Sequence, residues 1–227
     1  MHRSPDEIEA DRLTVLGPDL GPLFHALDNE VSWIHGKWKE FRQLYASPET
    51  VELLNEVAPF FFRVVQDTLW HDVLLHVARL TDPPKSMGKP NLTLLRLPDA
   101  LPSGSLADDV RKIVDLAVSK AFFARDWRNR HLAHSDLHLA LGKAAEPLAS
   151  ASRQDMEDVL ETIRRIMNAV NRHFWNSSTA YDSFLSVHNA ESLIYFLRVG
   201  LKAERKRDER WSRGVVLPED LEPEGEG

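Results

Sequence analysis

The fold is decided by residues 20–44, which read LGPLFHALDNEVSWIHGKWKEFRQL. Apolar side chains recur in this stretch at steps of three and four residues, namely at Leu23, Leu27, Val31, Ile34, Trp38, Phe41 and Leu44. This spacing follows the turn of an α-helix, so the apolar side chains share one face. The stretch therefore predicts a long amphipathic helix with one face buried in a core.

Four further segments show the same period. Apolar stripes run through residues 61–80, 105–134, 160–174 and 193–200, and each predicts a helix. Ser47 followed by Pro48 is a helix start signal, and Pro59 should either kink a helix or mark a break near Ala58. No segment alternates with the period of two that is typical of strands. The sequence therefore predicts an all-α fold, an antiparallel bundle of long helices.

We expect three regions along the chain. Residues 1–19 form an N-terminal extension, residues 20–213 form a single helical domain, and residues 214–227 form an acidic tail. The tail is rich in Pro, Glu and Gly, a composition that is typical of disorder.

Composition narrows the class of protein. The chain has 227 residues, no cysteine and a formal net charge of −7. The lack of cysteine excludes disulfides and thiolate chemistry and suits a reducing cytosol. Five of the negative charges lie in residues 218–227, yet the remainder is still not basic enough to coat long nucleic acids. We see no signal peptide and no membrane-length apolar segment, and we expect a cytoplasmic protein.

The densest group of functional side chains is RDWRNRHLAHSDLH, residues 125–138, at the end of the third long stripe. One interpretation is a solvated helix end, in which Asp126 and Arg130 pair one turn apart. A second is a metal site, because His131 and His134 lie three residues apart on one side of a helix. Both interpretations are open at this point.

A third interpretation is metal-free cleavage of a phosphodiester. A histidine can take a proton from a ribose hydroxyl near neutral pH, and a guanidinium can stabilise the charge that develops on the phosphorus oxygens. Arg128 and His134 are the candidates. On one ideal helix they are about 120° and roughly 9 Å apart, so they converge only if the helix distorts or a second chain completes the site.

Several blocks of this sequence resemble the HEPN superfamily. Arg128 and Asn129, followed by His134, match its Arg–polar–His signature, in which four to six residues separate Arg and His. RNRHLAHSD, residues 128–136, resembles the abortive-infection AbiU-type branch, and so do RLTDPPK, residues 79–85, and NLTL, residues 91–94. The order and spacing of the blocks agree, and the resemblance covers residues 20–211.

The resemblance implies an up-and-down bundle with a four-helix core that usually dimerises. Many members are metal-independent endoribonucleases that act as toxins or in phage defence. By matching positions, Arg128 is implied to stabilise the phosphate, His134 to act as acid and base, and Asn129 to position them. Other members are catalytically silent bundles that bind a protein or nucleotide partner, and this is the alternative function.

These implications extend to ligands and partners. We expect an RNA substrate, no cofactor and no metal, and any antitoxin or regulatory partner to be a separate protein. We expect Arg125, Arg130 and His131 to bind the substrate. A homodimer with its two-fold axis near residues 129–133 would double the positive charge around one groove.

Other conspicuous residues have structural explanations. We expect the aromatic residues 60–62 to fill core or interface space and Arg79 to pair with Asp82 at a helix end. If Ile113 and Leu116 are buried, truncation to alanine should cost about 2–5 kcal/mol.

Overall fold

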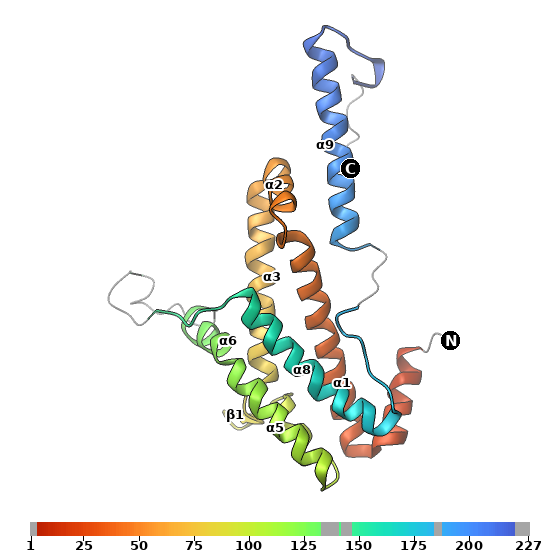
Figure 1. Ribbon diagram of the computed structural model, residues 1–227, viewed down its shortest axis with the longest axis vertical. Helices are drawn as coiled ribbons and strands as arrows, with labels where there is room; N and C mark the ends of the chain where they lie inside the picture. The colour runs from red at the N-terminus through yellow and green to blue at the C-terminus, as the bar shows by residue number, and fades with distance from the viewer. Residues whose placement is uncertain (1–3, 133–140, 142–146, 184–187, 221–227) are drawn as a thin grey trace. The chain divides into compact units, whose positions relative to one another are not determined.

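The computed structural model describes residues 4–132, 141, 147–183 and 188–220, and it confirms the predicted all-α fold (Figure 1). None of the helices within these ranges has the length and apolar character that a membrane span requires. A two-residue antiparallel hairpin pairs Lys85 with Pro90 and Ser86 with Lys89. The elements are α1 (Pro5–Tyr45), α2 (Pro48–Val57), α3 (Pro59–Leu80), β1 (Lys85–Ser86), β2 (Lys89–Pro90), η1 (Leu94–Arg96), α4 (Leu97–Ala100), α5 (Ser105–Lys120), α6 (Phe122–Trp127), η2 (Arg128–Leu132), α8 (Arg153–Trp175), α9 (Ala190–Ser212) and η3 (Pro218–Asp220).

The elements group into two compact units. The first contains Met1–Lys39 and Thr68–Phe184, and the second contains Glu40–Asp67 and Leu185–Gly227. The long helices α1 and α3 each contribute to both units. The candidate catalytic cluster of the sequence falls in the first unit.

Helix α2 begins where the sequence predicts a helix start. Ser47 caps α2 by accepting a hydrogen bond from the backbone N of Thr50 at 3.1 Å, with Pro48 directly after it. The chain breaks before Pro59, where α3 begins. Both are local effects of capping and of the proline ring, which is why they can be read without tertiary information.

Helix α1 consists of two segments that meet at Gly17. The φ angle of Gly17 is 79°, a conformation that glycine adopts without strain. The first segment then folds back closely along the second, because a Cβ atom on Gly21 would lie 2.9 Å from the Cα atom of Leu13. Helical structure therefore begins at Pro5, well before the first stripe of the sequence, since that fold-back is a tertiary contact.

Polar contacts fasten this first segment within the unit. Arg12 forms an ion pair with Asp28 and lies 2.9 Å from the Nδ1 atom of His25. The indole Nε1 of Trp175 donates to the carboxylate of Asp11 at 3.0 Å. The first segment of α1 is therefore bound both to the second segment of α1 and to α8.

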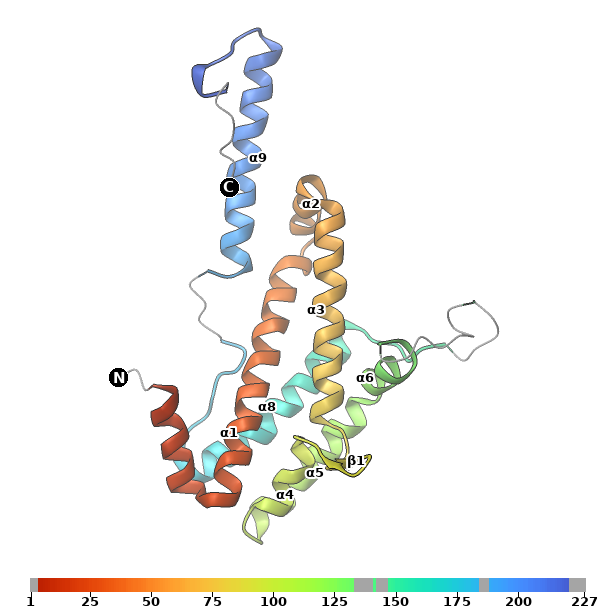
Figure 2. The same cartoon turned by 180° about the vertical axis from the view of Figure 1, so that it is seen from behind.

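The core of the first unit lies where α5 packs along α8, which are side by side in both views (Figures 1 and 2). Each fully buried Leu or Ile contributes about 1.5–3 kcal/mol of transfer free energy. The buried apolar residues are Ala107, Val110, Val114 and Ala117 on α5 and Met156, Val159, Leu160, Ile163, Ile166, Met167 and Val170 on α8.

Leu116 does not belong to this core. Its side chain is 41% exposed, and Ile113 is only half-buried. The buried face of α5 follows Val110, Val114 and Ala117 at steps of four and three, which turns Leu116 outward. The cavity cost of 2–5 kcal/mol therefore does not apply to Leu116.

The three consecutive phenylalanines divide between core and surface. Phe62 is buried, and its carbonyl accepts a hydrogen bond from the Tyr45 hydroxyl at 2.8 Å. Phe60 and Phe61 are 82% and 60% exposed. Only one of the three therefore fills the core of the second unit.

A buried polar cluster lies between α1 and the segment after α8. The ring of His35 stacks on that of Tyr181 with centroids 5.7 Å apart, and the Tyr181 hydroxyl donates to Asp28. Within the described chain, His35 Nε2 has no hydrogen-bond partner. Burial, aided by the charge of Arg164, lowers the pKa of His35 to about 4.

This depressed pKa predicts acid sensitivity of the fold. The unfolded chain binds a proton at residue 35 below about pH 6.5, whereas the folded chain does so only below about 4. The contribution of His35 to the free energy of unfolding should therefore be complete above pH 6.5, fall by about 3 kcal/mol as the pH drops to 4, and stay constant below that. Urea unfolding of the wild type and of His35→Gln across this range measures the effect.

The matched control is His173→Gln, which changes an exposed histidine on α8. The stability difference between wild type and His35→Gln should change with pH, while that between wild type and His173→Gln should stay nearly constant. Parallel curves for all three proteins would show that residue 35 does not carry this dependence.

Candidate functional site

The loop after α3 brings the two resemblance blocks 79–85 and 91–94 together. The hydroxyl oxygen of Thr93 lies 2.9 Å from the carbonyl oxygen of Leu80 and 2.7 Å from that of Asp82. The side-chain amide of Asn91 donates to the carbonyl of Pro83 at 2.8 Å. These contacts satisfy carbonyl groups at and beyond the helix end, where no helical partner exists.

Arg96 closes the same loop from its other side. Its Nε donates to the carbonyl of Asn91 and its Nη2 to that of Pro84, both at 2.6 Å. A loop held by side chains at several points presents its own side chains in fixed directions. The residue presented in this way is Asp82.

Asp82 accepts a hydrogen bond from Nη1 of Arg128, the first residue of η2. The two side chains are only 19% and 22% exposed. On its other side, Arg128 Nε donates to the side-chain oxygen of Asn129 at 3.0 Å. A guanidinium has five N–H donors, and the described residues accept from two of its nitrogens, so donors remain for an anion.

The expected ion pair between Arg79 and Asp82 is wrong. Arg79 Nη2 instead donates to Glu30 of α1 at 2.9 Å, and His76 Nε2 lies 3.3 Å from the same carboxylate oxygen. Helix α3 ends at Leu80, so Arg79 faces α1 while Asp82, beyond the turn, faces η2. Asp82 lies in the turn beyond the helix end, where the helical spacing that the pairing needs is lost.

Arg125 fastens α6 to its neighbours. Its Nη1 donates to the hydroxyl of Thr81 at 3.0 Å and its Nη2 to the carbonyl of Val118 at 2.6 Å. Burial lowers the pKa of the Arg125 guanidinium, and the nearby Asp82 carboxylate opposes this shift. Both terminal nitrogens are thus engaged inside the fold, and Arg125 fixes the direction in which α6 enters η2.

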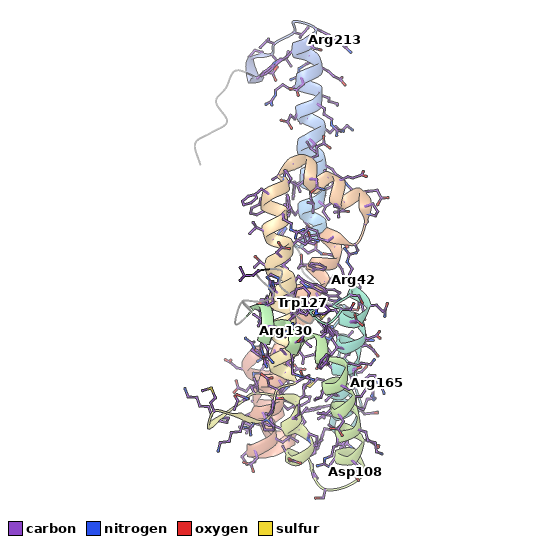
Figure 3. The ribbon with its side chains drawn as sticks, turned by 90° about the vertical axis from the view of Figure 1, so that its left-hand side faces the viewer. Arg42, Asp108, Trp127, Arg130, Arg165 and Arg213 are labelled. Atoms are coloured by element: carbon purple, nitrogen blue, oxygen red, sulfur yellow. The ribbon has the colours of Figure 1, made fainter. Side chains whose placement is uncertain are left out.

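The ion pair of Asp126 with Arg130 is present as the sequence predicts, at 3.4 Å. Asp126 also accepts from the backbone N of Ala149 at 2.8 Å, and Trp127 Nε1 donates to the carbonyl of Ala149 at 2.9 Å. Arg130 donates in addition to the carbonyl of Pro147 at 3.2 Å. Figure 3 shows Trp127 and Arg130 close together on this part of the first unit.

His131 is exposed between two aromatic neighbours. Its ring centroid lies 5.6 Å from that of Trp127 and 5.9 Å from that of His71, with edge-to-face geometry at both. Among the described residues, no three His, Asp or Glu side chains gather closely enough to hold a metal ion. His134 lies outside the described residues, so the structure does not test the metal interpretation that combines it with His131.

The single long helix expected over residues 105–134 is instead three elements. Helix α5 ends at Lys120, Ala121 interrupts it with a ψ angle of 7°, and α6 is followed by the π-helical turn η2. A π-helix closes its hydrogen bonds over five residues rather than four, and such turns recur at functional sites. Regular α-helical geometry therefore does not hold over Arg128–Leu132, and position 134 lies outside the described residues.

A cleft of about 340 Å³ adjoins the Asp82–Arg128 pair, since Asp82 is part of its wall. Sequence reasoning missed Glu30 here, because Glu30 comes from α1, some fifty residues away along the chain. No local signal marks Glu30, because its neighbours one helical turn away are Ala26 and Ile34 and offer it no partner. The cleft is lined by Glu30, Arg79, Leu80, Asp82, Pro90, Asn91 and Leu92.

Comparison with known protein families gives one finding that covers most of the chain. The family model HEPN_AbiU2, described as AbiU2, matches residues 17–193. Comparisons with curated proteins and with solved structures gave no match. The matched range contains both sequence blocks of the loop after α3 and all of α6 and η2.

The partly buried ion pair predicts measurable coupling between Asp82 and Arg128. In a double-mutant cycle with Asp82→Asn and Arg128→Gln, the coupling free energy should be about 1–2 kcal/mol, because both groups are largely removed from water. Urea unfolding of the four proteins measures it.

The matched control is the exposed pair Arg63 and Asp67, whose side chains are 70% and 48% exposed. Its coupling in the same cycle should stay below about 0.5 kcal/mol. Equal couplings for the two pairs would contradict the structural role given to Asp82.

Proposed function

Since the chain belongs to the HEPN_AbiU2 family of HEPN-type abortive-infection proteins, we propose that it is a metal-independent endoribonuclease with a defence or toxin role. Arg128, Asn129 and His134 carry the reaction in this proposal. The single observation that supports this proposal most strongly is the pair of hydrogen bonds that orients the Arg128 side chain. The guanidinium is oriented by Asp82 and Asn129, and the described part of the chain leaves N–H donors of Arg128 for a phosphate.

The reaction that suits these residues is an internal transesterification. The 2′-hydroxyl of the substrate attacks phosphorus and gives its proton to His134, the bond from phosphorus to the 5′-oxygen breaks, and that oxygen takes up a proton. Arg128 binds the non-bridging phosphate oxygens, where negative charge develops in the transition state. His134 lies outside the described residues, so its part rests on the family signature.

The residues beside Arg128 either contact the RNA or position Arg128 in this proposal. Arg130 and His131 contact RNA from the edge of η2, where His131 is exposed. Asn129 orients Arg128 through its side-chain oxygen. Arg125 acts as a positioning residue, because its terminal nitrogens are already engaged with Thr81 and Val118.

The working unit in this proposal is a homodimer with its two-fold axis close to η2. Within one chain, Arg125 and Arg128 place two positive charges around the single carboxylate of Asp82. A second copy would double this local excess of positive charge in an otherwise acidic protein and attract a phosphate. A separate antitoxin or regulatory protein would control the activity.

The second candidate function is a catalytically silent bundle that binds a protein partner. Large exposed apolar side chains in the second unit favour it, since such side chains often mark interaction surfaces. On α3, Phe60 and Phe61 are 82% and 60% exposed, and on α9, Tyr195 and Phe196 are 62% and 65% exposed.

Incubation of the purified protein with total RNA in EDTA separates these functions. The ribonuclease should cut RNA in EDTA, and His134→Ala and Arg128→Ala should each lower the rate by about 10²- to 10⁴-fold. The matched controls His173→Ala and Arg63→Ala change exposed residues outside the site and should keep the wild-type rate. No cleavage by folded protein favours the silent bundle, and cleavage that EDTA abolishes favours a metal-dependent hydrolase.

The chemistry of the product ends is a further prediction. Attack by the 2′-hydroxyl leaves a 2′,3′-cyclic phosphate or 3′-phosphate on one fragment and a 5′-hydroxyl on the other. DNA lacks that hydroxyl and should not be cut. End-group analysis of a labelled oligonucleotide tests this, and 5′-phosphate ends or efficient cutting of DNA would contradict the mechanism.

A mixing experiment tests whether two chains share a site. Inactive Arg128→Ala and inactive His134→Ala proteins are mixed under conditions that allow subunits to exchange. If one site uses Arg128 of one chain and His134 of its partner, mixed dimers contain an intact site and part of the activity returns. No recovery despite proven exchange would contradict the shared site, and a monomer by light scattering would contradict the dimer.

A further inference from the structure

We propose that the cleft beside Asp82 is a nucleobase subsite that selects guanine through Glu30 and Arg79. This inference rests on the proposed function, because the base would belong to the nucleotide whose phosphate Arg128 binds. The family match and the signature residues do not assign this cleft any role. Its size, its position and the pattern of its polar groups carry the inference.

The cleft is of suitable size and in a suitable place. Its volume of about 340 Å³ lies at the lower end of the range for small-molecule sites. Asp82 is part of its wall and at the same time pairs directly with Arg128. Asp82 therefore belongs both to the wall of the cleft and to the ion pair of Arg128, so we infer that a base in the cleft and a phosphate on Arg128 belong to one nucleotide.

Glu30 and Arg79 present a matched pair of hydrogen-bonding groups. Arg79 Nη2 donates to Glu30 Oε2 at 2.9 Å, so a guanidinium and a carboxylate lie side by side. His76 Nε2, 3.3 Å from the same oxygen, supports the carboxylate from the buried side. The side chains of Glu30 and Arg79 are 34% and 56% exposed, so a ligand can reach both.

This pair complements one base better than the other three. Arg79 has N–H groups besides the one that it gives to Glu30, and one of these beside the two oxygens of the Glu30 carboxylate offers a base the order donor, acceptor, acceptor. The Watson–Crick edge of guanine gives the opposite order, with the O6 acceptor next to the N1–H and N2–H donors. Adenine and cytosine have no imino proton beside the amino group, and uracil has one imino donor between two carbonyl groups, so each leaves a group of the pair unmatched.

Apolar side chains complete the subsite. Leu80, Pro90 and Leu92 line the cleft together with the polar residues. The flat faces of a base need such apolar contact, while its edge needs the hydrogen bonds. The hairpin of β1 and β2 supplies Pro90, and Asn91, which follows it, is held by Pro83, so the wall of the cleft is fixed before a ligand binds.

Binding of the four ribonucleoside 3′-monophosphates to the full chain tests the subsite without any need for cleavage. Isothermal titration calorimetry should give 3′-GMP a dissociation constant about tenfold lower than those of the other three nucleotides. The reason is that guanine forms charge-assisted hydrogen bonds with Glu30 and Arg79 that the other bases cannot all form. Glu30→Gln should remove this preference, because the amide offers only one acceptor. Arg79→Gln, at a more exposed position, should weaken 3′-GMP binding and provides a second variant that does not depend on the first.

The control Glu52→Gln makes the same change on an exposed residue of α2 and should keep the preference for 3′-GMP. Equal affinities for the four nucleotides, or an unchanged preference in both Glu30→Gln and Arg79→Gln, would overturn the subsite. Thermal melting shows that each variant is folded.

The outcomes also separate the subsite from the proposed function. Selective 3′-GMP binding by a protein that cuts no RNA supports the subsite and rejects the ribonuclease. Cleavage of RNA without selective 3′-GMP binding supports the ribonuclease and rejects the subsite.

Discussion

The candidate site depends on one ion pair, between Asp82 after α3 and Arg128 at the start of η2. The two residues are 46 positions apart in the chain, so the pair exists only after the helices have packed. Both groups have lost most of their contact with water, and each compensates the desolvation of the other. Asp82 in turn keeps its place because Thr93, Asn91 and Arg96 bind the backbone of the loop that carries it.

This arrangement also explains how an acidic chain can present a local positive charge. Arg125 and Arg128 both lie near the carboxylate of Asp82, so two positive charges gather at this point of the described chain. Arg125 is bound inside the fold, whereas Arg128 retains donors that point to no described residue. A phosphate would therefore bind to one oriented guanidinium rather than to a broad basic surface. A single site of this kind is compatible with the net negative charge of the chain.

The sequence predicts the local features of this fold well. The stripe of residues 20–44 became the buried face of α1, Ser47 caps α2, and Asp126 pairs with Arg130, because each depends on neighbours within one helical turn. The sequence does not predict contacts between side chains of different helices. Arg79 pairs with Glu30 rather than with Asp82, and Leu116 faces outward, since these outcomes depend on which helix lies opposite. The resemblance identified Arg128, Asn129 and the blocks 79–85 and 91–94, but only the folded chain shows that Asp82 of this loop orients Arg128.

The π-helical turn over Arg128–Leu132 has a consequence for how this protein tolerates change in length. A π turn corresponds to one residue inserted into an α-helix. Deletion of Leu132, the one residue of this turn to which the site gives no role, would let the segment wind as an ordinary α-helix and so change the directions of the side chains within it. Such a deletion would leave Arg128, Asn129, Arg130 and His131 chemically intact and still redirect them. In this segment the winding of the backbone, rather than the count of residues, sets where side chains point, so a one-residue deletion there should be more damaging than most single substitutions.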